Sequence, residues 1–136
     1  MTSTAKYQDL NVLIVDDDEF QVDFVSDLLS GLGIKNIVAA NGGKQGLAEF
    51  DRAATKPDLL LCDIQMPDID GFEFMKAMGE RNFCGGVILM SGQGARVLYS
   101  ASLVAQLSRQ NFLGNIEKPV NRQSIVEKIE QMLGPA

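Results

Sequence analysis

The sequence of 136 residues contains no histidine and only two cysteines, Cys62 and Cys84. Without an imidazole, the protein lacks the usual general base of hydrolases, a common zinc ligand and a histidine phosphate carrier. The cysteines have neither CxxC spacing nor neighbouring metal ligands, so we expect buried, reduced thiols. Many hydrolase mechanisms are therefore excluded.

Long apolar runs and an excess of positive charge are also absent. No run approaches the roughly 20 apolar residues that cross a membrane. The N-terminal stretch MTSTAKYQDLN lacks the apolar segment of a secretory signal, so we expect a cytoplasmic protein with no membrane partner. The net charge of −6 disfavours direct binding to nucleic acid, which depends on Lys and Arg neutralising phosphates.

The composition that remains is typical of a soluble globular protein, with 46% hydrophobic and 22% charged residues. A chain of this length can bury about two thirds of its unfolded surface around one core. There is no internal repeat, low-complexity segment or linker. We therefore expect a single domain over residues 1–136, with its core from about 10 to 133.

Apolar runs alternate along the chain with segments of helical periodicity. The runs predict buried strands at 11–15, 34–40, 58–62, 87–90 and 113–116. Helices are predicted from about 20 to 32, from 43 to 54, around 72–78, after 92, and up to 133 behind the N-cap Asn121. This alternation predicts an α/β fold, a doubly wound parallel sheet of five strands with helices on both faces.

Two of the helices carry apolar stripes that we expect to pack against the sheet. In the first helix, the apolar positions 20, 24, 25, 28, 29 and 32 form one stripe. In the helix after the fourth strand, positions 97, 101, 104, 105 and 108 share one face.

Polar residues follow most of the predicted strands. They are Asp16 and Asp17 after the first, Asp63 after the third, Ser91 after the fourth and Lys118 after the fifth. In open α/β sheets, ligands bind at this carboxyl edge of the strands. Each residue also has a plain explanation, since Asp18 or a neighbour can cap a helix and Asp63 or Ser91 can simply start a turn. Their shared position at the strand ends favours a common site.

The chemistry of such a site is predictable from its charges. Carboxylates from Asp16, Asp17 and Asp63 would repel one another unless a cation lies between them. Oxygen ligands without His or Cys select Mg²⁺ or Mn²⁺. Together with Lys118 and Ser91, this arrangement suits phosphoryl transfer with Asp63 as the nucleophile.

The motifs VLIVDDD, DIQMPDIDG, ILMSG and EKP, in this order, resemble the receiver domain of bacterial two-component response regulators. The resemblance covers nearly the whole chain. It implies a flavodoxin-like fold with strand order 2-1-3-4-5. It also implies a phosphoacceptor regulator that is not an enzyme beyond its own phosphorylation and dephosphorylation.

The resemblance assigns a role to each strand-end residue. Asp63 would accept a phosphoryl group from a phosphohistidine on a histidine kinase or phosphotransfer protein. The implied Mg²⁺ ligands are Asp16, Asp17, Asp63 and the backbone carbonyl of Gln65. Ser91 matches the hydroxyl that hydrogen-bonds the phosphoryl group, Lys118 matches the lysine that pairs with it, and the Lys118–Pro119 peptide bond is expected to be cis. The added charge would then shift the surface of the helix after the fourth strand and of the fifth strand, and so control an output partner or domain.

Two features depart from the family pattern. Asn115 stands three residues before Lys118, where family members usually carry the Tyr or Phe of a rotating switch. The segment between Ser91 and Lys118 is also longer than usual, and it resembles receivers attached to cyclic-di-GMP phosphodiesterase domains. The helix after the fourth strand is therefore where we expect the partner surface.

Three other interpretations remain open from the sequence. Asp16 and Asp18 form the DxD pattern of phosphatases of the haloacid dehalogenase type, although Glu19 and Phe20 do not fit its next positions. A flavodoxin-like flavin binder would need a first loop rich in donors, which the acidic DDDE is not. A receiver that serves only as an unphosphorylated interaction module is the third.

Overall fold

The computed structural model describes residues 7–92 and 101–133. Five parallel strands form one sheet in the order β2-β1-β3-β4-β5. Their bounds are β1 (Asn11–Val15), β2 (Asn36–Ala40), β3 (Leu59–Asp63), β4 (Gly86–Ser91) and β5 (Asn111–Glu117). The predicted doubly wound, flavodoxin-like fold is confirmed.

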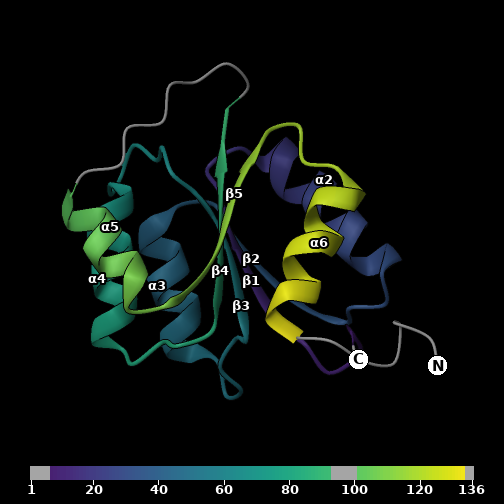
Figure 1. Cartoon of the computed structure of the whole chain (residues 1–136), viewed down its shortest axis with the longest axis horizontal. Coiled ribbons are helices and arrows are strands. Elements are labelled where there is room, and N and C mark those ends of the chain that lie inside the picture. Colours follow the sequence, from purple (N-terminus) through teal and green to yellow (C-terminus); the bar gives the residue numbers. More distant parts are fainter. Residues whose placement is uncertain (1–6, 93–100, 134–136) are drawn as a thin grey trace.

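Helices cover both faces of the sheet (Figure 1). On one face lie α2 (Glu19–Gly31) and α6 (Arg122–Leu133). On the other lie α3 (Gly43–Arg52), α4 (Gly71–Glu80) and α5 (Ala101–Ser108). Among these described helices, none is long and apolar enough to cross a membrane.

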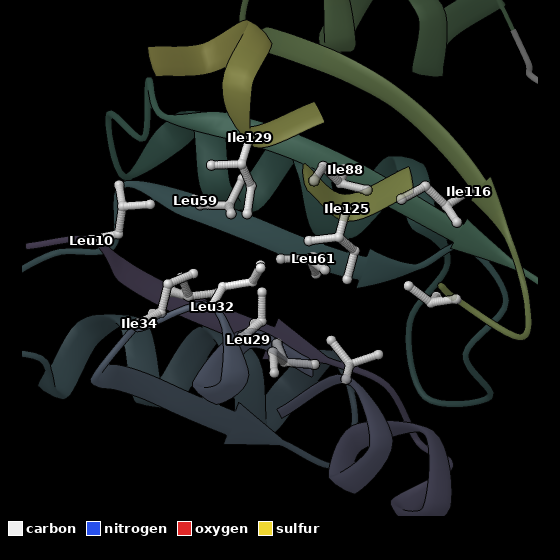
Figure 2. Close-up of a cluster of buried hydrophobic side chains, with 14 of the residues drawn as sticks. Leu10, Leu29, Leu32, Ile34, Leu59, Leu61, Ile88, Ile116, Ile125 and Ile129 are labelled. Atoms are coloured by element: carbon white, nitrogen blue, oxygen red, sulfur yellow. The ribbon is translucent and has the colours of Figure 1, made fainter. Parts of the chain in front are cut away.

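The central strand β3 is buried along its whole length and supplies both cores. Successive side chains of a strand point to opposite faces, so Leu61 packs under α2 and α6, whereas Leu60 packs under α3, α4 and α5. Figure 2 shows the first of these cores, with Leu29 of α2 and Ile129 of α6 among the side chains around Leu61. The strand whose end carries Asp63 is therefore packed against a core on each of its faces.

Local details confirm some expectations and correct others. The Lys118–Pro119 peptide bond is cis, and the Asn121 side chain accepts from Ser124 N at 2.8 Å, as expected of an N-cap. β2 begins two residues later than predicted, at Asn36. The expectation of two buried thiols was wrong for Cys84, which is exposed because it lies in the connection between α4 and β4.

The apolar stripe predicted for α2 is only partly correct. Val25 and Leu29 are buried, but Phe20 is 73% exposed and Phe24 is 38% exposed. At 100° per residue, the two phenylalanines lie roughly opposite Val22, which also faces the core. The apolar arc is wider than the face that the sheet can cover, so these phenylalanines stay in solvent.

The stripe predicted for the helix after β4 was wrong in the residues that the structure describes. Ala101, Val104, Ala105 and Ser108 of α5 are exposed. The buried residues are Leu103 and Leu107, an i, i+4 pair that the prediction did not use. The predicted stripe and the leucine pair both have helical spacing. The leucines face the sheet because their larger side chains bury more apolar surface. The remaining position of that stripe, Val97, lies outside the described residues.

Strand β5 contains a β-bulge that changes the direction of its last side chains. The ladder pairs Val87 with Phe112 but Ile88 with Gly114, so Leu113 is an extra residue opposite β4. Gly114 has a φ of 137°, a conformation that favours glycine. The bulge therefore depends on the glycine at this position.

We expect Gly114→Ala to lower the free energy of unfolding by on the order of 1–3 kcal/mol, because alanine is strained at this φ. The added Cβ would also lie 2.9 Å from Lys128 Cε. Urea unfolding measures the change. Gly31→Ala is the control, because at the end of α2 an added Cβ has no atom within 4 Å and alanine suits a helix better. Equal losses in both variants would contradict this role of Gly114.

Candidate functional site

The ends of four strands bring the residues predicted from the sequence to one edge of the sheet. Asp16 follows β1, Asp63 ends β3, Ser91 ends β4 and Lys118 follows β5. Asp16, Asp63 and Ser91 are 0%, 5% and 3% exposed. Buried acids are rare unless they are paired, so the acids at this edge need a positively charged partner.

Three carboxylates converge at this edge. Asp16, Asp17 and Asp63 each offer an oxygen atom within 4.8 Å of those of the other two. Asp16 Oδ1 also accepts from Asp18 N, and Asp63 Oδ1 accepts from Gln65 N, each at 3.0 Å. A set of oxygen ligands without nitrogen or sulfur fits Mg²⁺. The backbone carbonyl of Gln65 stays a predicted further ligand.

The Lys118 ammonium lies between two of these carboxylates. Its Nζ is 2.8 Å from Asp16 Oδ2 and 3.3 Å from Asp63 Oδ2. Burial opposes the charge of the ammonium, but the hydrogen bond to Asp16 and the charge of Asp63 outweigh it and raise the pKa of Lys118. The lysine therefore stays protonated at neutral pH and offsets part of the repulsion between the acids.

Asp63 lies in an environment that disfavours its own charge. Burial raises the pKa of Asp63 to about 6, and the charge of Asp16 acts in the same direction. The hydrogen bond from Gln65 N and the charge of Lys118 oppose this shift. A carboxylate with incomplete charge compensation is stabilised further by a nearby divalent cation.

Ser91 is held from two sides. Lys118 N donates to the Ser91 carbonyl oxygen at 2.7 Å, which joins the end of β5 to β4. Asn115 Nδ2 donates to Ser91 Oγ at 3.2 Å. The residue that departs from the family pattern is thus a direct partner of the predicted phosphoryl-binding hydroxyl.

The loop after β3 is fixed by hydrogen bonds at two points. Ile64 N donates to the Met90 carbonyl of β4 at 3.0 Å. Further along, the Asp68 carboxylate accepts from Gly43 N at 3.2 Å and from Lys44 N at 2.9 Å. The hydrogen bond from Lys44 lowers the pKa of Asp68. The segment that carries Gln65 is therefore tied to the first turn of α3.

Asp68 is a residue of this site that was not predicted from the sequence. The start of α3 could have indicated that a capping residue was needed. Its N-cap is Gly42, which has no side chain to accept from the first helical N–H groups. A helix that begins with two glycines needs a cap from elsewhere in the chain. The loop that carries Asp68 packs closely against the start of α3. A Cβ added to Gly43 would lie 1.9 Å from Ile69 Cγ2 of this loop.

Comparison with known proteins extends over nearly the whole chain. A sequence model of the response regulator receiver domain matches residues 12–130. The chain is 32% identical over 127 residues to a probable chemotaxis protein CheY from Rhizobium etli, covering 92% of this chain and 93% of that protein.

Two further similarities concern a longer protein and a solved structure. The chain is 34% identical over 134 residues to protein-glutamate methylesterase/protein-glutamine glutaminase 6 from Anaeromyxobacter dehalogenans, covering 94% of this chain but 36% of that protein. The crystal structure of the CheX-CheY-BeF3-Mg²⁺ complex from Borrelia burgdorferi matches with a TM-score of 0.75 and 25% identity, covering 93% of this chain and 90% of that chain.

The charge arrangement predicts that Asp63→Asn stabilises the fold when divalent cations are removed. The folded-state pKa of Asp63, about 6, lies above the ordinary value of 3.8, so the folded state binds this proton more tightly. The resulting loss of stability is absent below about pH 4 and complete above about pH 6. We therefore expect the free energy of unfolding of the variant to exceed that of the parent by about 1–3 kcal/mol at pH 7 and to be nearly equal to it near pH 4.

Urea unfolding in EDTA across this pH range checks the prediction. Asp23→Asn is the control, because it removes the same charge from an exposed position on α2. A variant at Asp63 that is less stable than the parent at pH 7 would show that the carboxylate is well compensated without a metal.

Proposed function

The chain belongs to the response regulator receiver domain family, whose members act in phosphorylation-dependent signalling, and from this premise we propose that Asp63 accepts a phosphoryl group. The observation that carries the proposal is the Lys118 ammonium between the buried carboxylates of Asp16 and Asp63. Positioning and charge neutralisation provide most of the catalysis in phosphoryl transfer. The protein then works as a switch rather than as an enzyme with a separate substrate.

The proposed donor is a phosphohistidine on a histidine kinase or phosphotransfer protein in the cytoplasm. A carboxylate oxygen of Asp63 attacks the phosphorus. A P–O bond forms while the P–N bond breaks, and the electron pair returns to the histidine nitrogen. Lys118, which is 3.3 Å from Asp63 Oδ2, offsets charge on the phosphoryl oxygens, and the Ser91 hydroxyl donates to one of them. Water later hydrolyses the acyl phosphate and resets the switch.

Mg²⁺, or Mn²⁺ in its place, fits the oxygen ligands that this edge gathers. The proposed ligands are the carboxylates of Asp16, Asp17 and Asp63 and the backbone carbonyl of Gln65. When bound, such an ion supplies positive charge to the phosphoryl oxygens. The chain's own hydrogen bonds position the acids, since the N–H of Asp18 orients Asp16 and the N–H of Gln65 orients Asp63.

The structure weakens two of the alternative functions. Asp18 accepts from Phe20 N at 3.0 Å and from Gln21 N at 3.4 Å, so it caps α2 and is not a second catalytic acid beside Asp16. This argues against the phosphatase. The acidic cluster would repel the phosphate of a flavin. The unphosphorylated interaction module is separated from our proposal by experiment.

We expect the parent protein to gain one phosphoryl group when incubated with acetyl phosphate or phosphoramidate and Mg²⁺, and to gain none in EDTA. Intact mass measures the gain. Asp63→Asn should gain none, whereas Asp70→Asn, whose side chain accepts from Glu73 N at the start of α4, keeps the site and should gain the group. No gain in the parent favours the interaction module, and a gain that survives Asp63→Asn means that another nucleophile reacts.

The output surface that we propose lies on α5 and β5. Val104 is 52% exposed and Phe112 is 38% exposed. With Leu107 and Gln110 they line a groove of about 390 Å³ between the helix and the strand. The groove suits a partner protein or output domain with an apolar contact. Attachment to a cyclic-di-GMP phosphodiesterase domain stays a prediction from the sequence.

If phosphorylation reshapes this surface, backbone amide hydrogen exchange should change in α5 and β5 when beryllofluoride and Mg²⁺ imitate the phosphoryl group. Mass spectrometry of peptides from 101–117 measures the change. Peptides covering β2, on the opposite edge of the sheet, are the internal reference and should be unchanged. Protection confined to the strand-end loops would contradict an output surface on α5 and β5.

A further inference from the structure

We propose that Asn115 is a positioning residue that orients the Ser91 hydroxyl toward the phosphoryl group on Asp63. This inference rests on the function proposed above and adds a regulatory part to its site. The observation behind it is the hydrogen bond from Asn115 Nδ2 to Ser91 Oγ, at 3.2 Å. Of the two side chains expected here from the family resemblance, Phe has no group that could donate this bond, and Tyr carries its only donor at the far end of the ring.

The β-bulge at Gly114 places Asn115 where this bond is possible. After the extra residue, Asn115 lies opposite Leu89 and Glu117 lies opposite Ser91. Residues opposite each other on paired strands share a face of the sheet, and Leu89 belongs to the core under α3, α4 and α5. A shift of one residue moves every later side chain of a strand to the opposite face. Without the bulge, Asn115 would therefore point away from the face of Ser91.

The hydrogen-bonding capacity of the two groups decides the direction of the effect. A side-chain NH₂ only donates, so the Ser91 oxygen must accept this bond. The hydroxyl proton is then directed to a different acceptor. Ser91 is only 3% exposed, so water competes little for that proton. Accepting one hydrogen bond also strengthens the hydroxyl as a donor.

Asp63 and Ser91 lie at the same edge of the sheet, because they end the neighbouring strands β3 and β4. The register pairs Asp63 with Met90, the residue just before Ser91. The ends of β3 and β4 are tied there by the hydrogen bond from Ile64 N to the Met90 carbonyl, at 3.0 Å. A phosphoryl group on Asp63 would extend beyond this edge, where its oxygens could accept the proton of the Ser91 hydroxyl.

The test measures the affinity of the full chain for beryllofluoride with Mg²⁺, followed by ¹⁹F NMR. We expect Asn115→Leu, which keeps the size and removes the donor, to weaken binding about two- to tenfold, the range of one hydrogen bond. The resonance of the fluoride that faces Ser91 should move. Asn36→Leu is the matched control, with the same substitution at the exposed start of β2 on the opposite edge of the sheet, and should leave both unchanged.

A double-mutant cycle with Ser91→Ala separates positioning from general damage. In the Ser91→Ala background, Asn115→Leu should have no further effect on affinity. Equal losses with and without the Ser91 hydroxyl overturn the proposal. Tighter binding by Asn115→Leu overturns it too, since Asn115 would then compete for the hydroxyl.

The parent's own behaviour distinguishes the two proposals. A parent that binds no beryllofluoride and gains no phosphoryl group removes the proposed function, and this inference with it. If the parent binds beryllofluoride and gains the phosphoryl group, but Asn115→Leu has the same affinity and ¹⁹F spectrum as the parent, only the role of Asn115 is overturned.

Discussion

The structure depends on one electrostatic constraint, which is that two buried carboxylates, Asp16 and Asp63, share an edge of the sheet. Their mutual repulsion in a poorly solvated site must be offset by positive charge. Lys118 supplies it from the end of β5, and its side chain reaches past β4 to contact acids that belong to the ends of β1 and β3. The charge balance therefore links three of the five strands, β1, β3 and β5, and it connects Asp63 to the end of β5 through Lys118.

Much of this arrangement was predictable from the sequence because it is local or topological. The alternation of apolar runs with helical periodicity predicts a parallel sheet, and a parallel sheet collects its strand ends at one edge. Asp16, Asp63, Ser91 and Lys118 meet there for that reason. Helix faces were harder, because Phe20 of α2 and Val104 of α5 fit an apolar stripe yet lie in solvent. Spacing alone does not say which of two overlapping stripes meets the sheet.

Contacts that depend on non-local geometry were not predictable. Asp68 caps a helix that begins more than twenty residues earlier, and no spacing rule connects the two. Asn115 departs visibly from the family pattern, but its hydrogen bond to Ser91 depends on a register shift in β5. A register shift is a property of paired strands, so a single segment of sequence does not reveal it.

The bulge at Gly114 has a second consequence, for the behaviour of the protein in a crowded solution. β5 is an edge strand, and the unpaired N–H and C=O groups of a regular edge strand can recruit a strand from another molecule. A bulge twists the edge and interrupts that regular row of groups. The glycine that brings Asn115 to Ser91 thus also disfavours aggregation through the outer edge of β5, which no strand of residues 7–92 and 101–133 pairs with.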